Sequence, residues 1–191
     1  MSITWIDTRP NPITTSEAKL HLRVDSTAED SLITGLVSAG TEYIETITGR
    51  AMVSGTLEHT RNDLPTAIPL PRNPVQSVVS VVLVDENGSE TTVDPSVYDL
   101  DTTELPHRIV LKSSQSWPSI TLANANAVRI RVVAGYGSSA SVPETLKAAH
   151  KLFVSNFYEI REPVAFGTIA PEVPFSIKAL LAPYRVDGWT A

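Results

Sequence analysis

The sequence contains no cysteine, and this absence excludes several kinds of chemistry at once. Without thiols the chain forms no disulfide, offers no thiolate nucleophile and has no cysteine ligand for a metal. Long apolar runs are also missing, because no stretch reaches the roughly 18 residues that indicate a transmembrane helix. The N-terminus, MSITWIDTRP, has no basic region followed by an apolar run, so we expect no secretory signal and no membrane partner.

The sequence has fewer basic than acidic residues. The 191 residues include 15 Lys and Arg against 21 Asp and Glu, which gives a formal net charge of −6. Proteins that hold nucleic acid through a general basic surface have the opposite balance. The composition, 42% hydrophobic and 19% charged, is that of a globular protein. The length suffices for one domain, or for one domain that carries a large insertion.

Enzyme motifs are absent as well. The sequence has no GxSxG, P-loop or GxGxxG pattern. Its four histidines lie neither at the i, i+4 spacing of a helical metal site nor in a ligand cluster, so we interpret them as surface or core-edge residues: His21, His59, His107 and His150. We therefore predict no catalytic residue, no metal and no cofactor, and favour a binding or structural role.

Two segments have some features of ligand sites. AGYGSS, at 134–139, precedes a predicted helix, but it lacks the lysine and the glycine spacing of a phosphate loop and is typical of a turn that ends a strand. Seven acids and no Lys or Arg lie between Asp85 and Glu104. The EF-hand pattern is missing there, so we interpret this stretch as a solvated acidic face, with calcium binding as the alternative.

The segment from Ser26 to Arg50 shows the strongest helical pattern. Its apolar residues recur at steps of three and four, which predicts an amphipathic helix of about six turns. Ser26 and Glu29 have the spacing of a capping box, and Gly49 suits a left-handed position after the last turn. Thr14 with Glu17 predicts a second box and a short helix over 15–23, next to the long one.

Helical signals return after residue 140. Ser141 and Glu144 repeat the capping-box spacing, and an apolar stripe predicts a helix over 143–162. Residues 163–174 hold three prolines and are expected to form a linker, after which Ser176 is expected to cap a last helix that ends at Leu181. The stripes of the two long helices predict a shared core: Leu32, Ile33, Leu36, Val37, Tyr43, Ile44, Ile47, Leu146, Phe153 and Phe157.

Between the helical segments the pattern is that of strands. Alternating side chains predict strands at 56–61 and 128–132, and β-branched residues at 77–84 indicate a strand buried on both faces. Asn87-Gly88 is a hairpin signal with a return strand at 90–93, and 98–100 and 108–111 are shorter candidates. The prolines at 65–74 predict a loop or edge segment, and residues 1–13 are expected to be irregular.

These elements predict an α+β fold in which a bundle of about four helices carries a β-rich module between helices two and three. The expected boundaries are 1–55 for the N-terminal half of the bundle, 56–137 for the module, and 138–191 for the C-terminal half with a docking tail.

Several segments together resemble the head–tail connector, or head-completion adaptor, family of tailed bacteriophages and gene transfer agents. They include KLHLRVD at 19–25, TGR at 48–50, LPRNPVQSVVSVVLVDENG at 70–88, AGYG at 134–137, VPETLKAA at 142–149, YEIRE at 158–162 and LLAPYRV at 180–186. Their order and spacing match over nearly the whole chain, whereas any single segment is a weak signal.

The resemblance implies a non-catalytic virion protein, made in the host cytoplasm, that forms a ring of about twelve copies through one repeated heterologous contact. Such a ring joins the portal protein to a downstream stopper or tail protein and extends a channel through which double-stranded DNA passes without sequence-specific binding. The alternative is another virion or tail component, or a monomeric protein-binding module.

The C-terminal segment is the candidate portal-binding site. Its aromatic and charged residues beyond Pro183 have the character of interface anchors: Tyr184, Arg185, Val186 and Trp189. The resemblance implies that this end reaches into the portal. We expect deletion of Val186–Ala191 to leave a folded protein that no longer attaches stably to portal-containing heads.

Overall fold

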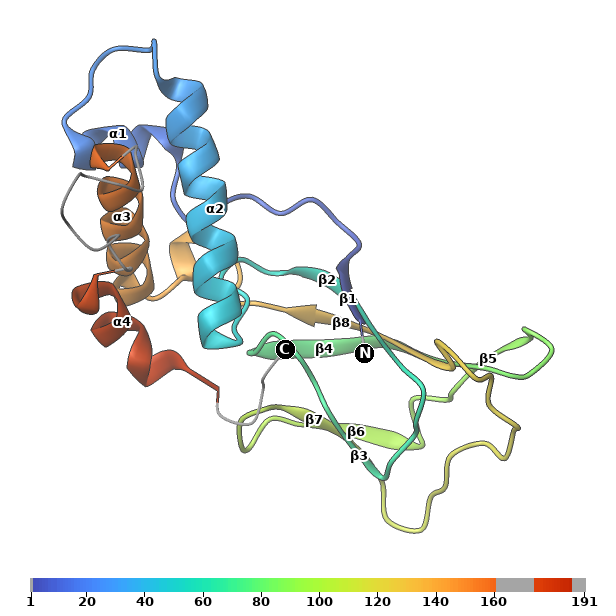
Figure 1. Ribbon diagram of the computed structural model, residues 1–191. Coiled ribbons are helices and arrows are strands. Elements are labelled where there is room, and N and C mark those ends of the chain that lie inside the picture. The colour runs from blue at the N-terminus through green and yellow to red at the C-terminus, as the bar shows by residue number, and fades with distance from the viewer. Residues whose placement is uncertain (1, 161–173, 187–191) are drawn as a thin grey trace, which may run out of the picture. The chain divides into compact units, whose positions relative to one another are not determined.

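The computed structural model describes residues 2–160 and 174–186 (Figure 1). The fold is α+β, with β-sheets inserted between helices α2 and α3, as predicted. Contacts divide the chain into two compact units. The helical unit comprises Pro10–Val53 and Tyr136–Arg185, and the β unit comprises the residues up to Arg9, Ser54–Gly135 and Val186. Over the described residues no helix is both long enough and apolar enough to cross a membrane.

The helical unit consists of α1 (Thr15–Leu22), α2 (Asp30–Thr48), α3 (Glu144–Glu159) and α4 (Phe175–Leu181), with short 3-10 turns η1 (Ser139–Ser141) and η2 (Ala182–Tyr184). The capping box before α1 is confirmed, because Thr14 Oγ1 accepts from the Glu17 N–H at 3.1 Å and Glu17 Oε2 accepts from the Thr14 N–H at 2.7 Å. Gly49 ends α2 in the left-handed region, with φ 67°, also as predicted.

The other three predicted caps are wrong. Helix α2 begins at Asp30, and the Glu29 carboxylate accepts from the Tyr158 hydroxyl of α3 instead of reaching back to Ser26. Helix α3 begins directly after Pro143, and its Glu144 pairs with Lys147 at 2.9 Å. Helix α4 follows Pro174, so Ser176 lies inside it. In each case a tertiary contact or a proline's fixed φ decides the start of the helix.

Helices α2 and α3 share two apolar clusters. One contains Ile44 with Leu146 and Phe153, together with Ile177 of α4. The other joins Ile33 and Val37 to Val154 of α3, and α1 adds Ala18. Leu36, Tyr43 and Phe157 are partly buried against these clusters. Leu32 and Ile47, which we expected in the core, are instead 41% and 40% exposed, because they lie at the margins of the helical stripe.

The β unit contains two antiparallel sheets. The larger has strand order β1-β2-β8-β4-β5, and the smaller has order β3-β7-β6. The larger is formed by β1 (Ser2–Trp5), β2 (Gly55–Arg61), β8 (Val128–Ala134), β4 (Val75–Val84) and β5 (Glu90–Thr92), and the smaller by β3 (Ala67–Pro69), β7 (Arg108–Leu111) and β6 (Tyr98–Asp101). The predicted alternation is present, since Leu57, Ile130 and Val132 are fully buried while Arg131 is exposed.

Two details of the β unit differ from the prediction. The segment expected to be irregular contains β1, which pairs with β2 so that Trp5 lies opposite Leu57. Strand β4 is not buried on both faces, because Val79 is 55% exposed. The proline cluster contains β3 at a sheet edge, where a missing donor is tolerated, in agreement with the predicted loop or edge segment. The hairpin at Asn87-Gly88 is confirmed, with Gly88 at φ 82° between β4 and β5.

Candidate protein interfaces

The four histidines lie on separate elements, and over the described residues no group of three His, Asp or Glu side chains could hold a metal ion. His59, His107 and His150 are buried, at 0%, 9% and 0% exposure, so the prediction of surface or core-edge positions fails for these three. Burial lowers the pKa of His150 to about 4, which keeps the ring neutral, and its Nε2 lies 2.8 Å from the Val37 carbonyl oxygen. These rings are structural, because each is held by backbone groups of neighbouring elements.

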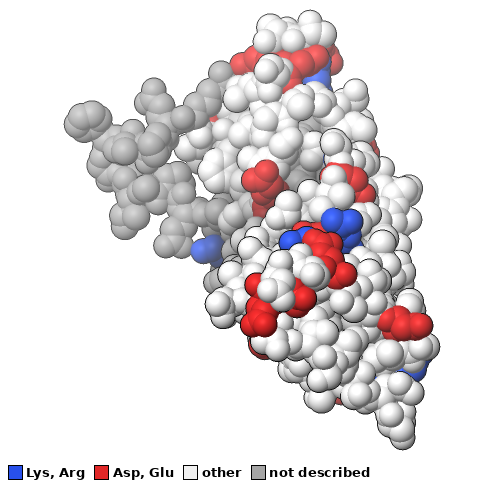
Figure 2. Space-filling view, turned by 90° about the vertical axis from the view of Figure 1, so that its right-hand side faces the viewer, with Lys and Arg blue, Asp and Glu red and all other residues white. Residues whose placement is uncertain are grey.

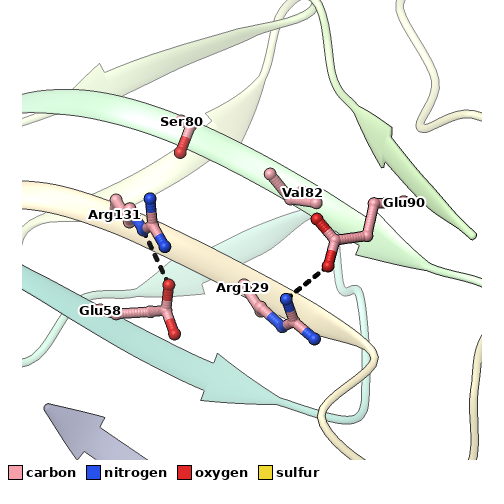
Figure 3. A pocket seen from close by; sticks show the side chains of 6 residues that line it. All are labelled: Glu58, Ser80, Val82, Glu90, Arg129 and Arg131. Carbon is pink, nitrogen blue, oxygen red and sulfur yellow. Dashed lines mark hydrogen bonds and ion pairs between the residues drawn. The ribbon is translucent and has the colours of Figure 1, made fainter. Parts of the chain in front are cut away.

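The outer face of the five-stranded sheet carries two cross-strand ion pairs (Figure 3). Arg131 Nε lies 2.8 Å from Glu58 Oε2, and Arg129 Nη1 lies 2.6 Å from Glu90 Oε1. Ser80 and Val82 of β4 complete a shallow hollow with these residues. Two arginines and two glutamates line the hollow, and each arginine is paired with a carboxylate.

The acid-rich stretch between Asp85 and Glu104 is largely exposed, as predicted, but much of it has partners. Lys112 pairs with Asp99, and Arg108 pairs with Asp101. Hydrogen bonds from Thr103 and Arg108 lower the pKa of Asp101 to about 2. On the face drawn in Figure 2, carboxylates form separate patches, some beside a basic side chain, rather than one continuous field.

The predicted portal-binding residues have different surroundings. Tyr184 is partly buried against the core cluster that contains Ile44. Arg185 is exposed, and Val186 is only 6% exposed. Trp189 lies outside the described residues. The chain therefore leaves η2 with a partly buried tyrosine, an exposed arginine and a buried valine in succession.

Arg50 ties three distant segments of the helical unit together. Its Nε donates to the Tyr184 carbonyl at 2.6 Å, and its Nη1 donates to the Tyr136 hydroxyl at 2.9 Å. The guanidinium carbon also lies 5.8 Å from the Tyr184 ring centroid. We call these three residues the Arg50 clamp. Sequence reasoning missed it, although TGR and AGYG, the motifs that supply Arg50 and Tyr136, were among the segments that carry the family resemblance.

The backbone around the clamp is fixed by neighbouring contacts. The Thr48 hydroxyl donates to the Ile44 carbonyl at 2.7 Å, and Gly49 turns the chain in the left-handed region. The Tyr136 N–H donates to the Met52 carbonyl at 3.2 Å, while buried Glu45 accepts from the Met52 N–H at 2.8 Å. Arg50 and Tyr136 thus start from anchored backbone, so their side chains meet without a large loss of backbone freedom.

The described residues form an α+β scaffold whose solvent-exposed side chains include two cross-strand ion pairs. The family of phage gp6-like head-tail connector proteins matches residues 12–109, slightly more than half of the sequence, and the chain belongs to this family. It is a structural, non-catalytic family, and this protein is a head–tail connector of a phage-like virion. A comparison with curated proteins found no match.

Solved structures of gene transfer agent (GTA) particles contain similar chains. One, from the neck of an empty GTA particle computed with C6 symmetry, is 26% identical and has a TM-score of 0.82. A second, from the virion of a native GTA particle, is 25% identical with a TM-score of 0.81. A third, from the neck of a native particle computed with C12 symmetry, is 25% identical with a TM-score of 0.77. Each alignment covers 100% of this chain and 98% of the other.

Proposed function

We propose that this protein forms a ring of about twelve copies at the head–tail junction, joining the portal to the next stopper or tail protein. The observation that carries the proposal is the family membership together with full-length similarity to chains from symmetric GTA necks. A ring is closed by one heterologous contact repeated around the axis, in which two different surfaces of each copy meet.

The ring would extend the channel through which DNA passes. Lys and Arg contacts to phosphates are what give proteins affinity for DNA. The net charge of −6, and the pairing of basic side chains such as Arg129 and Arg131 with carboxylates, disfavour tight binding. Weak affinity suits a passage that double-stranded DNA must traverse in both packaging and ejection.

The β unit would lie outside the wall of the ring and take part in lateral or tail-side contacts. Its hairpin from Asp85 to Glu90 is exposed apart from the partly buried Asp85, which accepts hydrogen bonds from the Asn87 and Ser89 N–H groups. Burying the Glu86 carboxylate without a partner would be costly, so a position at the wet rim of an interface fits the hairpin better.

The C-terminal segment would dock on the portal through Tyr184, Arg185 and the residues that follow. Aromatic side chains flanked by arginine are frequent anchors at interfaces. Because Val186 is buried in the protomer, the cleanest test removes only the residues after it. Truncation after Val186, and separately Trp189→Ala, should leave thermal stability near that of the full chain and reduce occupancy on portal-containing heads at least tenfold.

Native mass spectrometry tests the ring. The full chain is measured alone and with purified portal, because assembly could require the portal as a template. A closed assembly of about twelve copies in either sample supports the proposal. A protein that remains monomeric at micromolar concentration in both samples, with no portal-bound species, would favour the alternative of a monomeric binding module.

A further inference from the structure

Strand β1 is a terminal strand of the five-stranded sheet, and one side of its backbone has no partner strand among the described residues. In an antiparallel pair, alternate residues point their N–H and C=O groups toward the partner strand and away from it. The Ile6 N–H donates to the Thr56 carbonyl at 2.8 Å, so the residues two and four positions before Ile6 also face β2. Ile3 and Trp5, which alternate with them, therefore present their backbone groups at the open edge.

Strand β1 also lacks the features that usually protect an exposed edge. Native sheets block such edges with proline, with charged side chains or with very short strands. Both β3 and β5 have only three residues, and they contain Pro69 and Glu90 respectively. Strand β6 contains Asp99 and Asp101. The sequence of β1, SITW, has no proline and no charge, and isoleucine, threonine and tryptophan favour strands.

The residues that follow β1 hold it in place. The Asp7 carboxylate accepts from the Thr56 N–H at 2.8 and 3.0 Å, and the Arg9 guanidinium carbon lies 3.3 Å from the Trp5 ring centroid. These side chains lie against Gly55, where an added Cβ would be 2.3 Å from Arg9. Because β1 is already extended and anchored, less conformational entropy is lost when another strand pairs with it.

A second copy of the chain does not supply a matching strand. The edge strands β3, β5 and β6 carry the proline or the acidic residues that oppose pairing. Pairing of β1 with the β1 of another copy is an isologous, two-fold contact, whereas copies around one ring axis meet through heterologous contacts. A partner strand for β1 is therefore expected from a different protein.

We propose that β1 accepts an extended, uncharged segment of the stopper or tail protein, which adds to the five-stranded sheet as a further strand. This inference rests on the proposed function, which gives tail-side contacts to the β unit. Backbone hydrogen bonds provide the affinity of such strand addition, and alternate side chains provide its specificity. The segment is expected to be uncharged, because β1 has no charged side chain that would compensate a charge on its partner.

Hydrogen exchange measures the pairing directly. Complete particles are compared with heads that carry the connector but were made without the stopper or tail protein, and mass spectrometry follows the peptide that contains Ser2–Trp5. The outward N–H groups of Ile3 and Trp5 should exchange about tenfold more slowly in complete particles, because each gains a hydrogen bond. Equal exchange in the two samples would overturn the proposal. Protection that is already present in the heads would also overturn it, because the partner would then be the portal or another copy.

Proline at position 3 tests the open edge by mutation. Ile3→Pro removes an outward N–H and leaves the hydrogen bonds to β2 in place, so the variant should occupy heads normally while the number of tailed particles falls about tenfold. Ile3→Ala loses the same side chain but keeps the N–H, and should change tail joining by no more than about twofold.

The matched control is Thr92→Pro, which places a proline at an outward position of the edge strand β5. The Val93 N–H donates to the Val81 carbonyl, so the N–H of the preceding Thr92 points away from β4. This variant should change neither occupancy nor tail joining. Electron microscopy counts tailed particles, and quantitative mass spectrometry measures the amount of connector on the heads.

Normal tail joining by Ile3→Pro would overturn strand addition, as would loss of this variant from the heads. Equal losses of tail joining in Ile3→Pro and Ile3→Ala would do so too, because the effect would then belong to the side chain. If Ile3→Pro fails to fold, as judged by circular dichroism and tryptophan fluorescence, hydrogen exchange in the natural sequence decides. Absence of the natural sequence from the heads would instead refute the proposed function, so the two failures are distinguishable.

Discussion

The contact between α2 and α3 and the ion-paired face of the five-stranded sheet both contain polar residues. These residues are buried at the helix contact and exposed to solvent on the sheet. At the helix contact, His150 is fully buried, and a Cβ on Gly40 would lie 2.6 Å from the His150 ring. On the sheet, Arg131 and Glu90 are 50% and 53% exposed although both are paired. Removing the partner of a buried polar group lowers the free energy of unfolding, because the group is left without a hydrogen bond. Removing the partner of an exposed group costs less, because water takes its place.

Spectroscopy can follow the two units separately. Trp5 and Trp117 lie in the β unit, and residues 10–53 and 136–185 contain no tryptophan. Circular dichroism at 222 nm reports mainly on the helices, so it follows the helical unit. Tryptophan fluorescence follows the β unit, with a contribution from Trp189. The following predictions use both signals.

The largest expected effect comes from Phe153, which stacks on Tyr43 with ring centroids 5.1 Å apart and packs against Phe157 at 4.5 Å. Phe153→Ala should lower the free energy of unfolding of the helical unit by about 3–5 kcal/mol through cavity formation, and Ile44→Ala by about 2–5 kcal/mol. Chemical denaturation followed at 222 nm measures both. Leu32→Ala is the matched control and should cost less than 1 kcal/mol, as is usual for an exposed position. A midpoint for Phe153→Ala equal to that of the natural sequence would refute the shared core.

Acid should weaken the helical unit through His150. Its pKa is about 4 in the folded state and near 6.5 when unfolded, so between these values the unfolded chain binds the extra proton. The stabilisation is complete above pH 6.5 and is lost as the pH falls toward 4, by about 3 kcal/mol in total.

The control for this titration is His150→Gln, whose amide can still donate to the Val37 carbonyl but does not titrate. Its unfolding free energy at 222 nm should vary less between pH 6.5 and 4 than that of the natural sequence. Burial also lowers the pKa of His59, so a similar acid dependence in the fluorescence signal should persist in this variant. Equal slopes at 222 nm for both proteins would exclude His150 as the source.

Gly35 and Gly40 provide a matched test of close packing, because both lie inside α2 and differ in the atoms around them. Gly40→Ala should cost about 1–3 kcal/mol, since the new methyl group meets the rings of His150 and Phe153 within 2.9 Å. Gly35→Ala meets nothing within 4 Å and should stabilise the helix by up to about 1 kcal/mol. Thermal unfolding at 222 nm should therefore shift in opposite directions. Shifts of the same sign would mean that the close approach at Gly40 is absent.

The smallest effect is expected on the sheet face. A double-mutant cycle with Glu58→Gln and Arg131→Gln should give a coupling of less than about 1 kcal/mol, because the pair is exposed and screened by salt. Unfolding followed by tryptophan fluorescence measures it, and 1 M salt should reduce it further. A coupling free energy above about 2 kcal/mol would show that this exposed ion pair contributes as much to stability as the buried polar groups between α2 and α3.

The sequence by itself determined the α+β order of elements, the alternation of β2 and β8, the capping box at Thr14 and the turn at Gly88. These features depend on residues that are close together in the chain, so the hydrophobic periodicity and the turn residues of the sequence indicate them directly. The same reasoning wrongly placed the start of α2 at Ser26. A capping pattern carries no information about distant residues, and the hydroxyl of Tyr158 on α3 donates a hydrogen bond to the Glu29 carboxylate.

Only the tertiary structure decided the burial of His59 and His150, the strand at Ser2–Trp5 and the Arg50 clamp. An arginine after a helix-ending glycine is ordinarily solvated, and nothing near TGR indicates a partner 134 residues away. Such a contact depends on packing that brings α4 against the end of α2, because that packing limits access of water to the hydrogen bonds and fixes both backbones.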